Sequence, residues 1–388
     1  MKKLGLIHKL LIALILGILI GFVAPSSIIR ILTTFNSLFG SFLNFSIPLI
    51  IIGFIVAGIA DLGSSAGKLL GITTFLSYLS SVMAGLLAYI VSINIFPIFI
   101  GMSSAVSTGN PEEKLLKPLL NFTLTPIMDI TSALIIAFLL GLGIAAVKGK
   151  TLYNASVEFQ KIMEKLIENI IIPLLPLHIM GIFSNLTYSG EIVKLLSLFW
   201  KVFLVILLLH LSIIFIQFLI ASIIGKKNLP KLLKNQVPAY LAAVGTQSST
   251  ATIPVNLEVA EKNGVSKGIR DFVIPLCATI HLSGSTISIT SLSIAVMLMN
   301  NMPFTFSTIL GFIAMLGVTM VAAPGVPGGA IMAALGLLQS ILGFNDALLS
   351  LMIALYVTQD SFGTACNISG DNAISIIVDS INSKLKNK

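Results

Sequence analysis

Long apolar stretches separated by short polar connections run along most of the chain, a pattern typical of membrane-spanning helices. About 20 consecutive apolar residues cross the hydrocarbon core of a bilayer as a helix. Six stretches in the first part of the chain are apolar and long enough to cross, and they cover about residues 9–24, 41–60, 69–97, 123–147, 162–185 and 197–224. Residues 101–120 are more polar, so we expect an external loop there.

The C-terminal part has a different pattern, in which two apolar arms flank a centre of polar or Gly-Pro residues. This pattern occurs over residues 236–261 and again over 305–341, and each arm is too short to cross a bilayer alone. Short arms around a turn at membrane depth indicate re-entrant hairpins. A full span follows each hairpin, over about 270–299 and 346–380, and each span is predicted to be broken by polar residues.

The unit of hairpin and broken span therefore occurs twice, and the second copy enters the membrane from the opposite side. Similar chain lengths separate Ser249 from His281 in the first copy and Gly325 from Asp360 in the second. Broken helices at matching positions of an inverted repeat point to a binding site near the bilayer midplane. The sequence thus predicts an all-α polytopic membrane protein with eight transmembrane helices and two re-entrant helical hairpins.

Composition and charge agree with this prediction and indicate an orientation. Hydrophobic residues make up 56% of the 388-residue chain and charged residues 10%, whereas a soluble domain is about 25% charged. With a cytoplasmic N-terminus, 18 of the 23 lysines and arginines fall in cytoplasmic segments, as the positive-inside rule requires. We therefore expect both termini in the cytoplasm of a cell inner membrane, and the net charge of +8 does not indicate a nucleic-acid partner.

Four polar side chains in the last apolar span, Asp360, Thr364, Asn367 and Asp371, are spaced four, three and four residues apart. This spacing places them on one face of a helix. Because a carboxylate at the centre of a membrane helix costs about 2.5–3.5 kcal/mol, two on one face indicate a site where polar cargo crosses the bilayer. Asp360 can hold an ammonium group, and Thr364 and Asn367 can hydrogen-bond polar atoms.

The hairpin tips offer groups that complement this stripe. The second arm of the first hairpin starts near Thr252, and backbone N–H groups at a helix N-terminus bind anions such as carboxylates. The hydroxyls of Ser248, Ser249 and Thr250 add polar contacts without adding charge. The second tip, Gly325–Gly328, offers backbone groups from the other side, so the tips and the stripe together match both ends of an amino-acid zwitterion.

Asp371 lies about three helical turns from Asp360, too far for both carboxylates to share one small ligand. A second cation is the simplest partner for Asp371. Sodium prefers oxygen ligands, which Asp371, Asn367 and the free carbonyls of a broken helix would supply. The sequence therefore favours sodium as the bound ion, and it contains no motif for an organic cofactor.

The motifs resemble those of a known family when they are taken in order. The chain resembles the dicarboxylate/amino acid:cation symporters, the glutamate-transporter family, in four successive motifs. These are Thr246–Val255, the broken seventh span, Gly325-Val-Pro-Gly328 and the stripe from Asp360 to Asn367-Ile-Ser-Gly-Asp371. The resemblance covers essentially the whole chain and is most specific over 236–380. Gln359-Asp-Ser361 and Ile253-Pro-Val-Asn256 are most similar to the bacterial serine/threonine:sodium symporter branch.

This resemblance implies a homotrimer that works by elevator-type alternating access. Residues 1–62 and 99–190 would form a static scaffold of helices 1, 2, 4 and 5. Residues 63–98 and 191–388 would form the transport domain, with helices 3, 6, 7 and 8 and both hairpins. The partners implied are a small amino acid, sodium and the lipid bilayer.

The resemblance also implies two sets of site residues. Substrate ligands would be Ser248, Ser249, Thr250, Ser285, Gly325, Val326, Asp360, Thr364 and Asn367, with Ser249 and Val326 binding the substrate carboxylate through backbone N–H groups. Sodium ligands would be Asp371, Asn367, Cys277 and His281 at one site, and Thr279, Met320, Val321 and Ala323 at a second.

Two departures from the family pattern refine the expected substrate and ions. Members that carry acidic substrates have an arginine three residues after the first Asp of the stripe, where this chain has Gly363. A side-chain carboxylate would lose its bidentate partner there. We therefore predict sodium-driven import of a small neutral amino acid, serine or threonine first. A proton-coupled symporter, or one for acidic amino acids or dicarboxylates, is the alternative.

The second departure is His281-Leu-Ser-Gly-Ser285, which stands where the family has Asn-Met-Asp-Gly-Thr. Ser283 removes the carboxylate of a third sodium site, for which Ser77, Ser80 and Ser81 are the remaining side-chain ligands. Two interpretations of His281 stay open. It is either a neutral imidazole that hydrogen-bonds a serine or a group that titrates and couples transport to protons.

Other functional classes fit the sequence less well. An intramembrane aspartyl protease needs two aspartates that meet from different helices, whereas Asp360 and Asp371 share one. Neither a His-Glu-x-x-His nor a Gly-x-Ser-x-Gly motif occurs, so no enzymatic activity is predicted. A passive channel would show ohmic current without accumulation of substrate. Cys277 and Cys366 lie in apolar segments and indicate neither a disulfide nor a metal centre.

Overall fold

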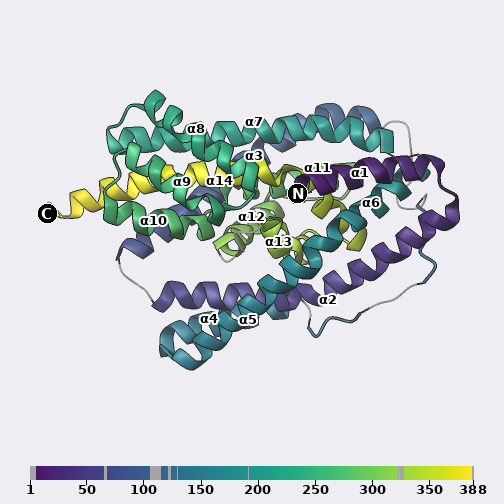
Figure 1. Cartoon of the computed structure of the whole chain (residues 1–388), viewed down its shortest axis with the longest axis horizontal. Helices are drawn as coiled ribbons and strands as arrows, with labels where there is room; N and C mark the ends of the chain where they lie inside the picture. Colours follow the sequence, from purple (N-terminus) through teal and green to yellow (C-terminus); the bar gives the residue numbers. More distant parts are fainter. Residues whose placement is uncertain are drawn as a thin grey trace, which may run out of the picture.

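The structure is a computed structural model that describes residues 6–64, 68–104, 115–120, 124–128, 130–190, 192–321, 323 and 327–386. The regular elements in these ranges are helices (Figure 1). The first half contains α1 (Leu6–Val23), α2 (Ser26–Ser64), α3 (Lys68–Ser104), α4 (Ile130–Val147), α5 (Lys150–Leu166), the π-helical η2 (Ile167–Ile171) and α6 (Ile172–Tyr188). The second half contains α7 (Ile192–Gly225), α8 (Leu229–Thr246), α9 (Ser249–Lys262), α10 (Lys267–Ile280), α11 (Ser283–Met299), α12 (Phe306–Val321), α13 (Gly329–Ser340) and α14 (Asp346–Lys386).

Several of these helices have the length and composition of membrane spans. Five segments of the described chain qualify, namely Ser26–Ala57, Leu69–Ile100, Lys150–Tyr188, Phe199–Gly225 and Lys267–Met299. Large apolar side chains such as Phe22, Leu139 and Ile223 are exposed, and exposed apolar surface of this extent suits contact with lipid. These features agree with the prediction of a helical, multi-pass membrane protein.

The helices pack in two groups. In the first, α2 packs against α4, α5 and α6, and α1 runs along α6. In the second, α14 contacts α7, α8, α10 and α11, while α3 packs against α11 and α12. Figure 1 shows α2, α4 and α5 along one edge, α7 and α8 along the opposite edge, and α14 between them. Helix α13 makes the most extensive contact between the groups, because it packs against α2 and α4 as well as α12 and α14.

The arms of both predicted hairpins are helices, and in each hairpin the two arms pack against each other. In the first, α8 ends at a left-handed residue, Gln247 (φ 55°), and the side chain of Ser248 caps α9 by accepting a hydrogen bond from the N–H of Ala251 at 3.3 Å. In the second, Gly328 (φ 75°) precedes α13, a conformation that glycine adopts without strain. Helix α8 begins at Leu229, earlier than the predicted start at 236.

The predicted break in the seventh span is confirmed, but the break predicted in the eighth span is wrong. Helix α10 ends at Ile280 and α11 starts at Ser283, with His281 and Leu282 in non-helical conformations between them. By contrast, α14 is continuously helical through its polar stripe. Polar side chains do not interrupt a helix whose backbone groups remain paired and which contains no proline.

Some other boundaries also differ from the predictions. Helix α2 begins at Ser26 rather than 41, and α4 begins at Ile130 rather than 123. The fifth span is longer than predicted because α5, η2 and α6 follow one another over 150–188. Helix α3 extends to Ser104, into the predicted external loop, and residues 115–120 of that loop are not helical.

Candidate functional site

The polar stripe of α14 lies in the interior of the second helix group. Asp360, Thr364, Asn367 and Asp371 are all buried. Their neighbours are the second hairpin, α11 and the break between α10 and α11, so the stripe faces the elements predicted to complete a site. The predicted helical spacing is therefore realised, and it places the two carboxylates at different ends of one polar track.

Asp360 lies between the second hairpin and α11. Its Oδ2 accepts a hydrogen bond from the backbone N–H of Gly328 at 2.6 Å, and the hydroxyl of Tyr356 also hydrogen-bonds this carboxylate. Oη of Tyr356 also lies 2.9 Å from Oγ of Ser285, so its one hydroxyl proton goes to either Asp360 or Ser285 at a given time. Both donors to Asp360 are neutral, so the carboxylate keeps its capacity to attract a cationic group.

Asn367 joins the stripe to the N-terminus of α11. Its Oδ1 accepts hydrogen bonds from the backbone N–H groups of Gly284 at 2.8 Å and Ser285 at 3.3 Å, and its Nδ2 donates to Oγ of Ser285 at 3.1 Å. The first N–H groups of a helix have no partner within the helix, and Asn367 supplies one here. Ser285 is thus the point where Asn367 and Tyr356 meet.

The predicted residues of the first hairpin tip differ in their exposure. Ser249 is buried, whereas the side chain of Thr250 is exposed. The hydroxyl of Ser248 lies 3.0 Å from that of Thr250. The hairpin is joined to α14 further along, where Asn372 Nδ2 donates to Asn256 and Asn256 Nδ2 donates to the carbonyl of Ile368 at 3.2 Å.

Two of the predicted substrate ligands, Gly325 and Val326, lie outside the described residues. Gly328, at the same tip, is described, and its backbone N–H contacts Asp360 of the stripe. The backbone role predicted for Val326 therefore stays a prediction.

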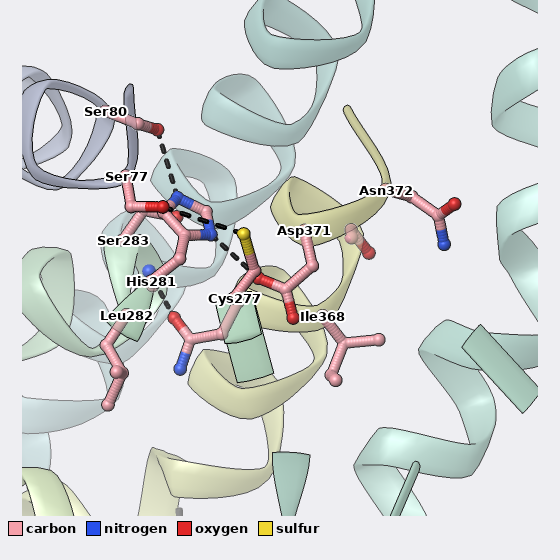
Figure 2. A network of polar contacts seen from close by, with 12 residues as sticks. Ser77, Ser80, Cys277, His281, Leu282, Ser283, Ile368, Asp371 and Asn372 are labelled. Carbon is pink, nitrogen blue, oxygen red and sulfur yellow. Dashed lines mark hydrogen bonds and ion pairs between the residues drawn. The ribbon is translucent and has the colours of Figure 1, made fainter. Parts of the chain in front are cut away.

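Asp371 forms a buried pair with His281, and Figure 2 shows this pair at the centre of a polar network. Nδ1 of His281 lies 2.9 Å from Oδ1 of Asp371, and neither side chain is exposed. On the other side of the ring, Nε2 lies 3.1 Å from Oγ of Ser80. Within the described part of the chain, Oδ2 of Asp371 has no hydrogen-bond partner. A buried carboxylate oxygen without a donor is unfavourable, so this oxygen fits the predicted role of a sodium ligand.

The remaining predicted sodium ligands lie on α10 and at the end of α12, two helices that contact each other. The carbonyl of Cys277 accepts a hydrogen bond from the N–H of His281 at 2.9 Å and keeps a second lone pair. Thr279 is exposed, and its hydroxyl donates to the carbonyl of Leu276. Met320 and Ala323 are buried and Val321 is half-buried, and the carbonyl of Met320 accepts a hydrogen bond from the N–H of Ala323 at 3.4 Å.

Three buried polar residues of this region were missed by the sequence analysis. Tyr356 lies one turn before Asp360. The other two are on α7. Gln217 contacts Ser80 and Ser283, and His210 contacts the carbonyl of Gly284. A lone polar residue inside an apolar span is itself a signal, and this criterion would have found Gln217 and His210.

Comparison with known proteins identifies the type of protein to which this site belongs. The sequence model of the sodium:dicarboxylate symporter family matches residues 6–381, which confirms the resemblance predicted from the motifs. Relatives named serine/threonine transporter SstT occur in Acinetobacter baylyi (25% identical, 97% of both chains) and Streptococcus suis (29% identical, 85% of this chain and 94% of that protein). Another is the SstT of Acinetobacter baumannii, at 25% identity over 97% of both chains. The matched proteins are transporters rather than enzymes.

Proposed function

We propose that this chain, which belongs to the sodium:dicarboxylate symporter family, is a secondary-active symporter that imports a small neutral amino acid with sodium. The observation that carries the proposal is the buried stripe of α14, which pairs Asp360 with the second hairpin and Asn367 with the N-terminus of α11. Serine and threonine are the first candidate substrates, and the printed names of the bacterial relatives support them.

The stripe and the tips divide the recognition of the substrate between them. Asp360 would hold the ammonium group, with its carboxylate oriented by Gly328 and Tyr356. Thr364 and Asn367 would contact other polar atoms of the substrate. Backbone N–H groups at the start of α9, near Ser249, and at the second tip would bind the substrate carboxylate, because helix N-termini favour anions.

The lack of a positive side chain beside the stripe favours a neutral substrate over a dicarboxylate. A methyl group at Gly363 would have its closest neighbours, Gly284, Ser285 and Ser288, at 3.7 Å, so this position borders hydroxyl and backbone groups of α11. Among the side chains whose burial the structure describes, no lysine or arginine is buried. A second carboxylate on the substrate would therefore be desolvated without a charged partner.

We infer that sodium supplies the driving force and that the two helix groups move relative to each other. Residues 1–62 and 99–190 would form the scaffold of a homotrimer in the cell inner membrane, with both termini cytoplasmic. Residues 63–98 and 191–388 would form the transport domain. The packing of α2 with α4, α5 and α6, and of α14 with α7, α8, α10 and α11, supports this division.

Uptake into proteoliposomes tests the function directly. Labelled serine, threonine, alanine, aspartate and glutamate are compared under an inward sodium gradient, an inward proton gradient, or neither. We expect accumulation of serine or threonine that requires sodium. Accumulation of aspartate, or accumulation driven by protons without sodium, would contradict the proposal, and ohmic current without accumulation would indicate a channel.

Replacement of Asp371 by asparagine should weaken the response to sodium more than the maximal rate of uptake. Removal of one partner from a buried charge pair costs about 2–5 kcal/mol, so the sodium concentration for half-maximal uptake should rise roughly 30-fold or more. Asp379→Asn is the matched control, because Asp379 is on the same helix and hydrogen-bonds Ser266 near the surface. An unchanged sodium response in Asp371→Asn would remove Asp371 from the ion site.

A further inference from the structure

The imidazole of His281 joins three helices at one buried point. It extends from the break between α10 and α11 toward Asp371 on α14 at 2.9 Å and toward Ser80 on α3 at 3.1 Å (Figure 2). Gln217 adds α7 to this junction, since its Nε2 donates to Oγ of Ser80 at 2.9 Å and to Oγ of Ser283 at 3.1 Å. We call Gln217, Ser80, His281 and Asp371 the junction network.

The hydrogen bonds of the junction network run in one direction. The amide nitrogen of Gln217 can only donate, so Ser80 accepts from it. In the neutral tautomer that points a ring proton at the Asp371 carboxylate, Nε2 of His281 has no proton and accepts the hydroxyl proton of Ser80. The remaining ring proton is then on Nδ1 and points at Oδ1 of Asp371. The chain of donors from α7 to α14 is thus complete with a neutral imidazole, and it needs no ion between Ser80 and Asp371.

The ring also fills the space of the junction. A methyl group at Gly370 would overlap Cε1 of His281 and would lie 2.8 Å from Oε1 of Gln217, so the ring packs directly against the backbone of α14. Ser77, the neighbouring serine of α3, is 3.6 Å from the sulfur of Cys277. Among the residues that the structure describes, Oγ of Ser81 and Oε1 of Gln217 have no hydrogen-bond partner, but two neutral oxygens are too small a ligand set for sodium, which takes several oxygens.

We propose that His281 is a built-in substitute for a bound cation: it supplies the donor to Oδ1 of Asp371 and occupies the volume between α3 and α14. Among the described residues no donor then reaches the other oxygen of Asp371, Oδ2, and Asp371 holds one sodium ion and no second. His281 is therefore a positioning residue that limits the number of ions carried with each substrate. The proposal rests on the proposed sodium-coupled function and specifies the ion stoichiometry of the same site.

The number of sodium ions carried with each serine tests this proposal. It is obtained in proteoliposomes from the serine gradient at which a fixed sodium gradient produces no net flux of serine. His281→Asn shortens the side chain and leaves three oxygens facing the junction, from the introduced amide, Ser80 and Asp371. We expect this variant to carry one more sodium per serine than the parent. His178→Asn is the control, because His178 is equally buried but lies on α6 and contacts Asn36, so its ratio should equal that of the parent.

An unchanged ratio in His281→Asn would overturn the proposal. If that variant does not transport, direct binding of radioactive sodium to the purified parent and to Asp371→Asn decides the question. A loss of one ion per chain in Asp371→Asn supports the proposal, and a loss of two or of none overturns it. Failure of the function itself is distinguishable, because the parent would then show no sodium-driven accumulation of serine at all.

Discussion

Replacement of Asp360 by asparagine should abolish uptake of serine and threonine while the protein still folds and assembles. The asparagine is close in size to aspartate and can still accept a hydrogen bond from Gly328, so the contact between α14 and the second hairpin is retained. The negative charge for the substrate ammonium is lost. Breaking a buried ion pair by removal of one partner costs about 3–5 kcal/mol, which corresponds to a loss of affinity of more than about 100-fold.

Binding and uptake of labelled serine test the loss of transport, and gel filtration with light scattering tests whether the variant still folds and assembles. Asp379→Asn makes the same chemical change elsewhere on α14, at a residue that hydrogen-bonds Ser266, and should leave uptake close to that of the parent. Uptake at the parent's level in Asp360→Asn would refute the role of Asp360 in holding the ammonium group. A change in the oligomeric state of the variant would instead point to a structural role.

Replacement of Gly370 by alanine should strongly reduce both stability and transport, although alanine normally favours a helix. The added methyl group would overlap the His281 ring and would lie 2.8 Å from the amide oxygen of Gln217. Both side chains are buried and hydrogen-bonded, so neither moves without loss of a bond. Overpacking of this kind costs about 1–3 kcal/mol, and displacement of His281 also disturbs Asp371, so we expect uptake to fall roughly 10-fold or more.

Gly363→Ala provides a matched comparison on the same helix. A methyl group there has its closest neighbours at 3.7 Å, an ordinary contact distance, and replacement of glycine by alanine inside a helix gains about 0.5–1 kcal/mol. The thermal unfolding temperature should therefore fall in Gly370→Ala and stay the same or rise in Gly363→Ala. Equal stability and equal uptake in the two variants would show that the His281 ring is free to move away from α14.

Local patterns in the chain were sufficient to predict the helical, multi-pass architecture and the burial of the polar stripe. Apolar length and helical spacing are local properties, so they identified both hairpins, the break at His281 and the buried stripe from Asp360 to Asp371. The break predicted from polar side chains in the eighth span is wrong, because α14 continues through them. Polar side chains indicate the surroundings of a helix, whereas a helix is interrupted only where its backbone hydrogen bonds are not formed.

Which polar groups satisfy one another became clear only from the packing of the helices. The pairing of His281 with Asp371 and Ser80 joins residues far apart in the chain, and so does the contact of Tyr356 with Ser285. Such contacts depend on how helices are rotated and packed against each other, and no local pattern records this. The sequence left His281 open between a structural and a titrating residue. The packing of its ring between α3, α7 and α14 is what identifies it as a partner of Asp371, because a buried carboxylate takes the nearest donor that the fold supplies.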